Sequence, residues 1–271
     1  MLTVNERPYP FQEGMQLGEL AAVIKPGADV LVRNGAPAAP DIFLEDGDIC
    51  FLIKKGEIPT PMEMEFNLQA RHGAQTQKKL RQSTVGIMGL GGLGSAVAIS
   101  LVKIGIGKLI ISDYDVVVLS NIHRQHYFID QIGEKKTKAL KKTLVRINPF
   151  VAVTTVDTRL CAESIPKIFT GVDVLIECFD KPDMKATALR TAMTKMPDTA
   201  YVGASGMAGL DSGNTIISRQ IKSNIFIVGD NLSDSATVGS LLAPRVGIAA
   251  HHQAHQAVRI LLNLEKEPDK A

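Results

Sequence analysis

The chain has 271 residues, a formal net charge of +2 and 21% charged residues. This length accommodates one large domain and one small one. The balanced charge is not that of a protein attracted to polyanions, so we expect no nucleic-acid partner. The first ten residues lack the apolar core of a signal peptide, and the uncharged run at 85–102 contains five glycines, so we also expect no membrane partner.

Cys50, Cys161 and Cys178 are the only cysteines, and they lie far apart in the sequence. Because none belongs to a Cys-x-x-Cys pair, the sequence favours neither a disulfide framework nor a cysteine zinc site. We therefore expect no zinc, and we expect a reducing, cytoplasmic location.

Residues 1–58 form a strand-rich region. The opening MLTVNERPYPF predicts two short strands around an Asn-Glu-Arg turn, and later patterns predict a helix at 17–24 and strands at 30–33 and 49–53. Two strands, a helix and further strands in so short a stretch are typical of a small β-grasp (α+β) fold. We predict a first domain at 1–58 and a second at 59–271.

Strands and helices alternate through the second domain. A helix is predicted at 64–82, and a strand, a glycine turn and an apolar helix follow from Val85 to Gly105. The remaining pattern predicts strands at 108–112, 151–156, 172–177, 199–203 and 214–219, and helices at 136–147, 183–196 and 246–264. This alternation predicts an α/β fold with a doubly wound, mostly parallel, Rossmann-like sheet covered by helices on both faces.

The glycine turn GLGGLGS, at 89–95, has the spacing of a nucleotide-binding βαβ unit. In such a unit Gly89 makes the tight turn, Gly91 lets backbone approach phosphate, and Gly94 lets the helix pack against the strand. Asp113 ends the next strand nineteen residues after Gly94, close to the spacing for a grip on ribose hydroxyls. Taken alone, a glycine turn of this kind also occurs in α/β proteins without a nucleotide.

Polar and cationic side chains follow this acid closely: Asp115, Asn121, Arg124 and Gln125. A dehydrogenase needs a flat slot for nicotinamide and no cluster of cations beyond the ribose acid. An amide and a guanidinium are instead expected where a polyphosphate is held beside the ribose. The sequence therefore favours ATP over NAD, with a dehydrogenase as the weaker alternative.

Together these motifs resemble the adenylating domain shared by ThiF, MoeB and the ubiquitin-activating enzymes. The resemblance runs from about residue 64 to 264 and has four parts in order: GLGGLGS with the Asp113 and Asp115 pair, SNxxRQ at 120–125, GxxK at 133–136, and Cys178-Phe179-Asp180. It implies an ATP-dependent adenylyltransferase that activates a carrier protein's C-terminal carboxylate and releases pyrophosphate.

The resemblance also assigns roles to residues of this chain. The expected nucleotide-binding residues are Gly89, Gly91, Gly92, Gly94, Asp113, Asp115, Asn121, Arg124, Gln125 and Lys136. Arg124 and Lys136 would act as phosphate cations, and Asp180 would be the Mg²⁺ ligand. For Asp180 the alternative is a cap for the helix that begins near Pro182.

One family arginine is missing. In ThiF and MoeB the helix before the first strand carries Arg-Gln, and its arginine reaches the ATP of the partner subunit. Leu68 precedes Gln69 at this place, and Arg71 lies three residues further on, nearly one helical turn away. The resemblance therefore implies a homodimer in which Arg71 takes this catalytic role, with a surface arginine as the alternative.

The first domain resembles ThiS-type sulfur carriers in VNERPY, VLVRNG and LEDGDICFL. Such carriers end in Gly-Gly with a free carboxylate, whereas here residues 54–59 read KKGEIP and the chain continues. We therefore expect the substrate to be a separate ThiS-like carrier for thiamine thiazole biosynthesis, with sulfur from a donor protein. The alternatives are a MoaD-like carrier in molybdopterin synthesis and a non-catalytic binding protein.

Overall fold

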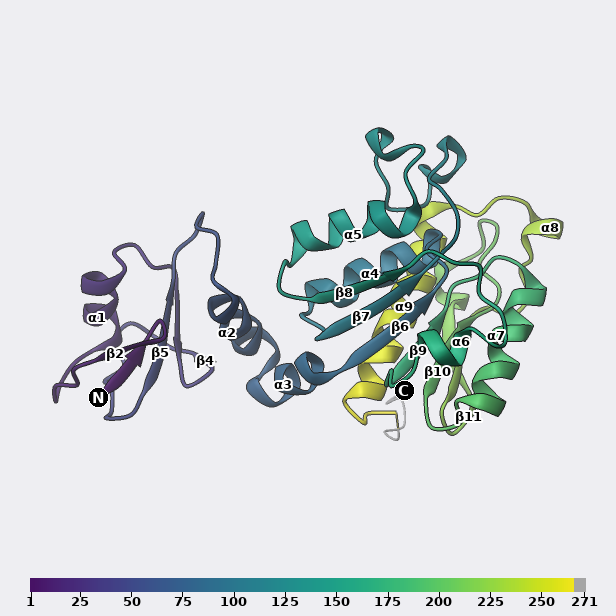
Figure 1. The fold of residues 1–271 in the computed structure, drawn as a ribbon. Helices are drawn as coiled ribbons and strands as arrows, with labels where there is room; N and C mark the ends of the chain where they lie inside the picture. Colours follow the sequence, from purple (N-terminus) through teal and green to yellow (C-terminus); the bar gives the residue numbers. More distant parts are fainter. Residues whose placement is uncertain (266–271) are drawn as a thin grey trace. The chain divides into compact units, whose positions relative to one another are not determined.

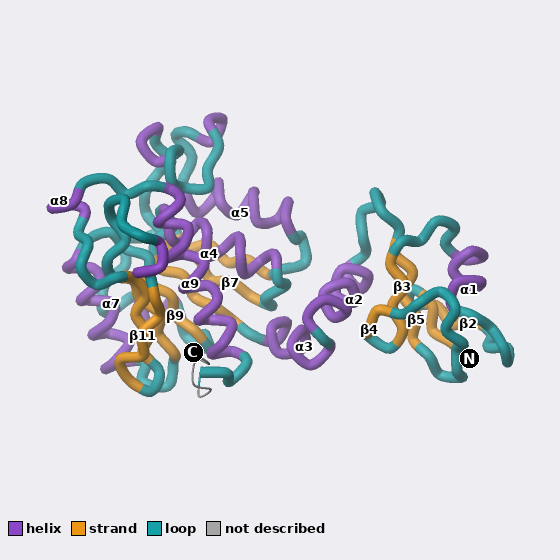
Figure 2. The backbone as a smooth tube through the Cα atoms, turned by 180° about the vertical axis from the view of Figure 1, so that it is seen from behind, coloured by secondary structure: helices purple, strands orange, loops and turns teal. Residues whose placement is uncertain are grey.

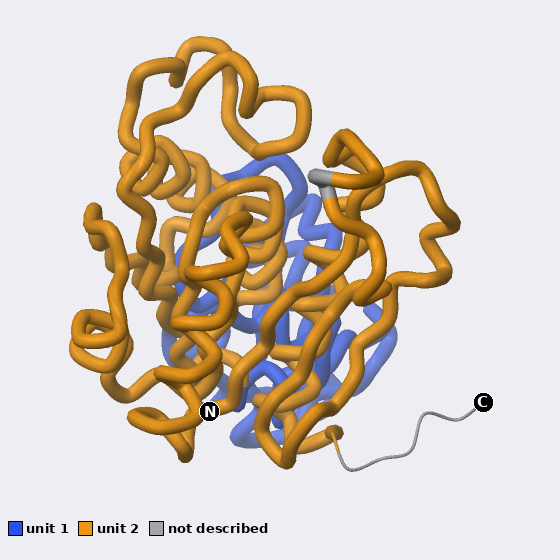
Figure 3. The backbone as a smooth tube through the Cα atoms, turned by 90° about the vertical axis from the view of Figure 1, so that its right-hand side faces the viewer, with its two compact units in different colours: residues 1–79 blue, residues 80–271 orange. Residues whose placement is uncertain are grey.

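The computed structural model describes residues 1–265, apart from the side chains of residues 235 and 236. The predicted second domain runs to residue 271, and its last part, 266–271, lies outside the described residues. The chain divides into two compact units, Met1–Lys79 and Leu80–Ala271 (Figure 3). The first unit therefore extends beyond the boundary that we infer after residue 58.

The first unit contains a five-stranded sheet in the order β2-β1-β5-β3-β4, with helix α1 against it (Figure 1). β1 and β2 are antiparallel, whereas β1 and β5 are parallel, as in a β-grasp fold. Its elements are β1 (Leu2–Val4), β2 (Arg7–Tyr9), α1 (Leu17–Ile24), β3 (Val30–Arg33), β4 (Ala36–Pro37) and β5 (Ile49–Ile53). The predicted small β-rich domain is confirmed.

Helix α2 (Pro61–His72) covers the second face of this sheet, where it contacts β3, β4 and β5. Side chains alternate along a strand, so Cys50 and Leu52 enter the core beneath α1 while Phe51 points the other way. Phe51 is nevertheless fully buried, because its ring stacks on Phe66 of α2 with the ring centroids 3.7 Å apart. The sheet therefore has a packed layer on each face.

The prediction of one continuous helix at 64–82 was wrong. Gly73 has a φ of +86°, and it separates α2 from α3 (Ala74–Gln82). A glycine adopts this left-handed conformation without the steric cost that a side chain would add, so it ends the helix. Helix α2 also begins earlier than predicted, because Thr60 and Glu63 form a capping box ahead of it.

The second unit contains a seven-stranded sheet (Figures 1 and 2). Its strand order is β11-β12-β10-β9-β6-β7-β8. All neighbouring strands are parallel except β11 and β12. The strands are β6 (Thr84–Met88), β7 (Lys108–Ser112), β8 (Ala152–Val156), β9 (Val174–Glu177), β10 (Ala200–Ala204), β11 (Ile217–Lys222) and β12 (Ile225–Gly229). The predicted doubly wound, mostly parallel sheet is confirmed.

Helices cover both faces of this sheet. Ile87 and Ile176 face a core shared with α4, α5 and α9, whereas Met88 and Leu175 face a core shared with α6 and α7. The helices are α4 (Gly92–Lys103), α5 (Lys136–Ile147), α6 (Ile165–Ile168), α7 (Pro182–Lys195), α8 (Ser235–Val238) and α9 (Ala243–Leu261), with 3₁₀ turns η1 (Leu119–Asn121), η2 (Ile129–Gln131) and η3 (Gly213–Thr215).

Two details at one edge of the sheet differ from expectation. The strand predicted at 214–219 begins later, because 213–215 form η3, and β12 was not predicted at all. β12 is an apolar run without the alternation that identifies a half-exposed strand. The apolar run at 85–102 comprises most of β6, the glycine turn and most of α4, and no helix of the described residues is long and apolar enough to cross a membrane.

The stacked pair Phe51 and Phe66 predicts that α2 stabilises the β-grasp sheet. In the full-length protein, Phe66→Ala should increase backbone hydrogen exchange in β3 and β5, because Phe51 loses the ring that covers it. Met62→Ala is the matched control, since Met62 lies on the same helix and is exposed. Equal exchange in the wild type and the Phe66 variant would contradict this interpretation.

Candidate functional site

A cavity of about 630 Å³ lies at the carboxyl edge of the seven-stranded sheet. The loops that follow β6, β7, β8, β9, β10 and β12 line it. In open α/β sheets, ligands bind outside the carboxyl ends of the strands where the strand order reverses. Here that point lies between β6 and β9. The chain adds β7 and β8 on one side of β6 and then returns to add β9 and β10 on the other side.

Most of the predicted site residues line this one cavity: Gly89, Gly91, Gly92, Asp113, Asp115, Arg124, Gln125, Lys136 and Asp180. They come from segments spread over more than ninety residues of sequence, and the sheet topology brings them together.

The glycine turn has the geometry that its spacing predicts. Gly89 has a φ of +87°, and a Cβ atom on Gly94 would lie 1.9 Å from the carbonyl oxygen of Gly89. At Gly91 the nearest atom to such a Cβ would be Nε2 of Gln125, at 3.8 Å, so the backbone is open towards the cavity. Helix α4 begins at this point with no side-chain cap, which leaves backbone N–H groups available for an anion.

Asp113 connects the tip of β7 to the glycine turn. Its Oδ2 atom accepts a hydrogen bond from the backbone N–H of Leu90 at 2.7 Å, and its Oδ1 atom accepts one from the N–H of Asp115 at 2.9 Å. An ionised carboxylate has about four acceptor positions. Asp113 can therefore hold the turn and still accept hydrogen bonds from ribose hydroxyls.

Two cationic residues, Arg124 and Lys136, line the cavity. Lys136, which is 5% exposed, donates from Nζ to Oδ2 of Asp115 at 3.1 Å. The guanidinium of Arg124 donates to the carbonyl oxygen of Ser120 at 3.1 Å. The Asp115 carboxylate therefore holds the lysine in the cavity wall, where its charge is available to an anionic ligand.

Buried polar atoms in the cavity wall indicate what kind of ligand fits. Oε1 of Gln125 and Oγ of Ser112 have no hydrogen-bond partner among the described residues, although both are shielded from solvent. A buried polar atom without a partner costs about 1–3 kcal/mol. Together with the open backbone at Gly91, these atoms suit a ligand that is rich in hydrogen-bonding groups, such as a nucleotide.

Asp180 lies just after β9 and is exposed to the cavity. The N-cap position of α7 falls on Lys181, so the alternative of Asp180 as that cap is not what the structure shows. Residues 1–265 contain no group of three or more His, Cys, Asp or Glu that could hold a metal ion. A single carboxylate still fits Mg²⁺, because this ion commonly takes one or two carboxylates and completes its shell with phosphate and water.

The cavity does not include every predicted residue. Asn121 does not line the cavity, and its Oδ1 atom accepts a hydrogen bond from the N–H of Val118 at 3.2 Å, which stabilises η1. Gly94 does not line the cavity, and its lack of a side chain lets α4 approach the carbonyl oxygen of Gly89. Arg71 is exposed on α2 in the first unit, and its catalytic role stays a prediction.

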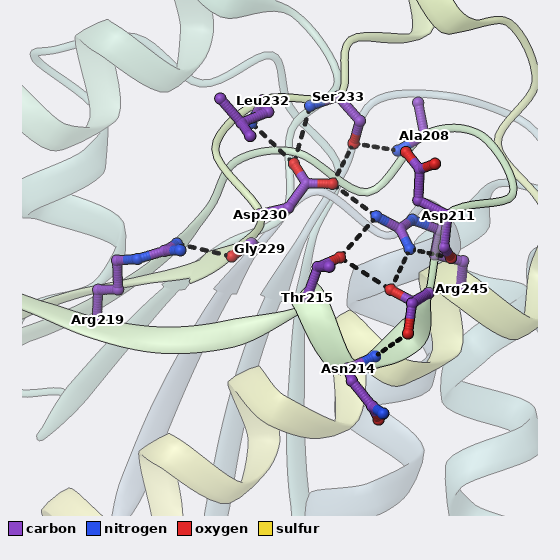
Figure 4. A network of polar contacts seen from close by, with 11 residues as sticks. Ala208, Asp211, Asn214, Thr215, Arg219, Gly229, Asp230, Leu232, Ser233 and Arg245 are labelled. Atoms are coloured by element: carbon purple, nitrogen blue, oxygen red, sulfur yellow. Dashed lines mark hydrogen bonds and ion pairs between the residues drawn. The ribbon is translucent and has the colours of Figure 1, made fainter.

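The wall beyond β10 and β12 depends on an ion pair that the sequence did not predict (Figure 4). Nη2 of Arg245, at the start of α9, donates to Oδ2 of Asp230 at 2.6 Å. The same guanidinium donates to the carbonyl oxygens of Asp211 and Ser212 and to Oγ1 of Thr215. Arg245 thus connects three segments that are distant in sequence.

Asp230 in turn fixes the loop that lines the cavity. Its Oδ1 atom accepts hydrogen bonds from the N–H groups of Leu232 and Ser233, each at 2.8 Å, and its Oδ2 atom accepts one from the hydroxyl of Ser233. Oγ of Ser233 accepts the N–H of Ala208 at 3.0 Å, so the loops after β10 and β12 are joined (Figure 4).

Two family models match the chain. Residues 65–271 match the ThiF family, and residues 1–56 match the ThiS-like ubiquitin family. The first match covers most of the chain, so the protein belongs to the ThiF family, with a ThiS-like ubiquitin domain in front. Both resemblances predicted from the sequence motifs are confirmed.

The chain is similar to several proteins that are named adenylyltransferases. The chain is 29% identical to the molybdopterin-synthase adenylyltransferase of Haemophilus influenzae, over 70% of this chain and 79% of that protein. The Escherichia coli protein of the same name is 30% identical, over 70% and 77%. The adenylyltransferase and sulfurtransferase UBA4 of Eremothecium gossypii is 30% identical over 87% of this chain and 54% of its own length.

Solved structures confirm the fold. The tRNA N6-threonylcarbamoyladenosine dehydratase TcdA of Escherichia coli, in complex with ATP, matches with a TM-score of 0.67 at 17% identity. The match covers 76% of this chain and 98% of TcdA. At this identity the likeness concerns the arrangement of helices and strands alone.

The ion pair of Asp230 and Arg245 predicts a defined effect on stability. Burial opposes ionisation of Asp230, but the hydrogen bonds from Ser233 and Leu232 and the Arg245 guanidinium outweigh it and lower the pKa of Asp230 from 3.8 to about 2. Because the pKa is lower in the folded state, the stabilisation is present above about pH 4 and is lost as the pH falls towards 2.

Arg245→Met should lower the free energy of unfolding at pH 7 by about 3–5 kcal/mol, because it leaves a buried carboxylate without its cation. The double variant Asp230→Asn/Arg245→Met should recover part of this loss. The difference in free energy of unfolding between the double variant and the wild type should become smaller as the pH falls from 4 to 2. Urea denaturation at several pH values measures both effects. An Arg245→Met protein as stable as the wild type would contradict the prediction.

Proposed function

We propose that the protein is an ATP-dependent adenylyltransferase that activates the C-terminal glycine carboxylate of a separate ThiS-like sulfur carrier for thiamine thiazole biosynthesis. One observation carries this proposal. A single cavity in a ThiF-family domain joins the glycine turn, the ribose acid Asp113, the cations Arg124 and Lys136, and Asp180.

The residues around the cavity give ATP a definite orientation in this proposal. Asp113 accepts hydrogen bonds from the ribose hydroxyls, and the phosphates lie over the open backbone at Gly91 and the first turn of α4. Arg124 and Lys136 neutralise the phosphate oxygens. The planar guanidinium of Arg124 and the mobile ammonium of Lys136 can together stabilise the negative charge as it moves to pyrophosphate. Gln125 supplies a neutral hydrogen-bonding group.

The reaction requires little from the protein beyond positioning and charge. An oxygen of the carrier's carboxylate forms a bond to the α-phosphorus of ATP, and the bond from that phosphorus to the bridging oxygen of pyrophosphate breaks. No proton moves, because a carboxylate is already ionised at neutral pH, so no general base is needed. Catalysis then rests on bringing two anions together and stabilising the leaving group.

Mg²⁺ would be held by Asp180 together with phosphate oxygens, and when bound it would neutralise developing charge on the phosphates. Asp180 suits this role because it is exposed at the cavity and lies after β9, next to the glycine turn.

The cysteines have no part in this half-reaction. Burial raises the pKa of the Cys178 thiol well above its usual value and that of Cys50 to about 11, so neither is an available thiolate. Cys161 is exposed but does not line the cavity. In this proposal the acyl-adenylate is the product, and a separate donor protein delivers the sulfur.

The ThiS-like domain at the front favours thiamine biosynthesis over molybdopterin synthesis, whereas the names of two relatives favour a MoaD-like carrier. A non-catalytic binding protein is the alternative from another class, because Leu68 replaces the family arginine. We place the active protein in the cytoplasm as a homodimer, with Arg71 of each subunit completing its neighbour's site.

ATP–pyrophosphate exchange tests the proposal and distinguishes the carriers. The wild type should catalyse exchange with a ThiS-like carrier and not with a MoaD-like one. Arg124→Ala and Asp180→Ala should each lower the exchange rate by about 100-fold or more, because each removes a charge that stabilises the transition state.

Matched controls for these two variants are Arg190→Ala and Asp183→Ala, which remove exposed charges on α7 outside the cavity. Both controls should retain exchange. Near-normal exchange in the Arg124 or Asp180 variant would mean that the site is wrong, and exchange only with the MoaD-like carrier would move the function to molybdopterin synthesis.

Mixing inactive chains tests the homodimer and Arg71 together. If Arg71 acts across a two-fold interface, Arg71→Ala and Asp180→Ala chains should each be inactive, and a mixture should regain exchange, because one site of a mixed dimer contains both native groups. The regained rate should stay below half of the wild-type rate. A fully active Arg71→Ala protein, or a mixture that stays inactive after proven subunit exchange, would exclude this role.

A further inference from the structure

A buried carboxylate at the end of β9 has no role in the reaction described above. Glu177 is 2% exposed, and its Oε1 atom accepts hydrogen bonds from the N–H of Phe179 at 2.6 Å and from Nζ of Lys185 at 3.0 Å. A buried charge needs such partners, because its hydration is lost. Glu177 therefore holds two neighbours of Asp180 in place, the peptide before it and a lysine on α7.

Lys185 reaches into the cavity from α7. Its Nζ atom also donates to the carbonyl oxygen of Ala204 at 2.8 Å, at the end of β10. An ammonium carries three N–H donors, and these two acceptors use two of them. The Lys185 side chain is 26% exposed and lines the cavity, so the third donor is available to a ligand.

The strand order places Lys185 opposite the expected nucleotide. Asp113 follows β7 and holds the ribose on that side of β6, and Lys136 is held nearby by its bond to Asp115. Lys185 lies over the ends of β9 and β10, on the other side of the point where the strand order reverses. Its ammonium can therefore bind the second reactant, the carrier's carboxylate, without displacing Lys136 from the nucleotide.

We infer that Lys185 binds the C-terminal carboxylate of the carrier and holds it against the α-phosphate of ATP. This assignment rests on the proposed function, because it names the residue that receives the second anionic substrate. Glu177 and the carbonyl of Ala204 keep the lysine extended at this position. The ammonium offsets the repulsion between the carboxylate and the phosphates, and it keeps the carboxylate ionised.

The test compares KM for the carrier with KM for ATP in ATP–pyrophosphate exchange. Lys185→Gln should raise KM for a Gly-Gly-ended ThiS-like carrier by about 10- to 100-fold, the loss expected for a hydrogen bond to a charged group. KM for ATP should stay within about twofold, because the nucleotide is held on the other side of the cavity. The matched control is Lys195→Gln, which removes an exposed lysine at the other end of α7, outside the cavity, and should change neither value.

A double variant separates binding from folding. Lys185→Gln leaves the buried Glu177 carboxylate without its cation, so the single variant is expected to lose thermal stability. Glu177→Gln/Lys185→Gln removes both charges and should recover stability, while KM for the carrier stays raised. A merely structural role would instead restore carrier KM together with stability.

The outcomes are distinguishable from a failure of the proposed function. Suppose that the wild type catalyses exchange and that a folded Lys185→Gln or double variant has the same KM for the carrier as the wild type. This result would overturn the role of Lys185 and leave the proposed function standing. An equal rise in KM for ATP would also overturn it. If the wild type supported no exchange with any Gly-Gly-ended carrier, the proposed function would fail and this inference with it.

Discussion

The cavity depends on the two hydrogen bonds that Asp113 accepts from the peptide N–H groups of Leu90 and Asp115. They fix the glycine turn to the tip of β7, and the close approach of Gly94 to the carbonyl oxygen of Gly89 fixes the same turn to α4. In the proposed function Asp113 would have a second role, because the carboxylate that shapes the turn is also the proposed ribose acid. A change of Asp113 is expected to affect shape and binding together.

The first unit is a β-grasp sheet whose second face is covered within the same chain. Phe66 of α2 stacks on Phe51, so α2 packs against the β-grasp sheet. Leu68, where the resemblance implies an arginine, is 8% exposed on this helix. A leucine at this position is consistent with a helix that packs against a sheet, whereas Arg71 is exposed on the same helix.

The parts of the site that could be predicted from the sequence are local motifs. The glycine turn, Asp113 and Asp180 each directly follow a parallel strand, and parallel strands of one sheet end at the same edge. Lys185 and Arg245 could not be predicted, because their roles depend on partners such as Ala204 and Asp230 that only the fold brings near. Asn121 differs from these residues: its motif is present, but it does not line the cavity, and its Oδ1 atom accepts a hydrogen bond from the backbone N–H of Val118.

Transfer of an adenylyl group from ATP to a carrier protein is the proposed reaction of this cavity. The most direct measurement is the intact mass of a Gly-Gly-ended ThiS-like carrier after incubation with the protein, ATP and Mg²⁺. The carrier should gain one adenylyl group while one pyrophosphate is released, and a carrier without its terminal glycine should gain none. ATP binding with no adenylated ThiS-like or MoaD-like carrier would contradict this reaction and would indicate a binding protein without catalysis.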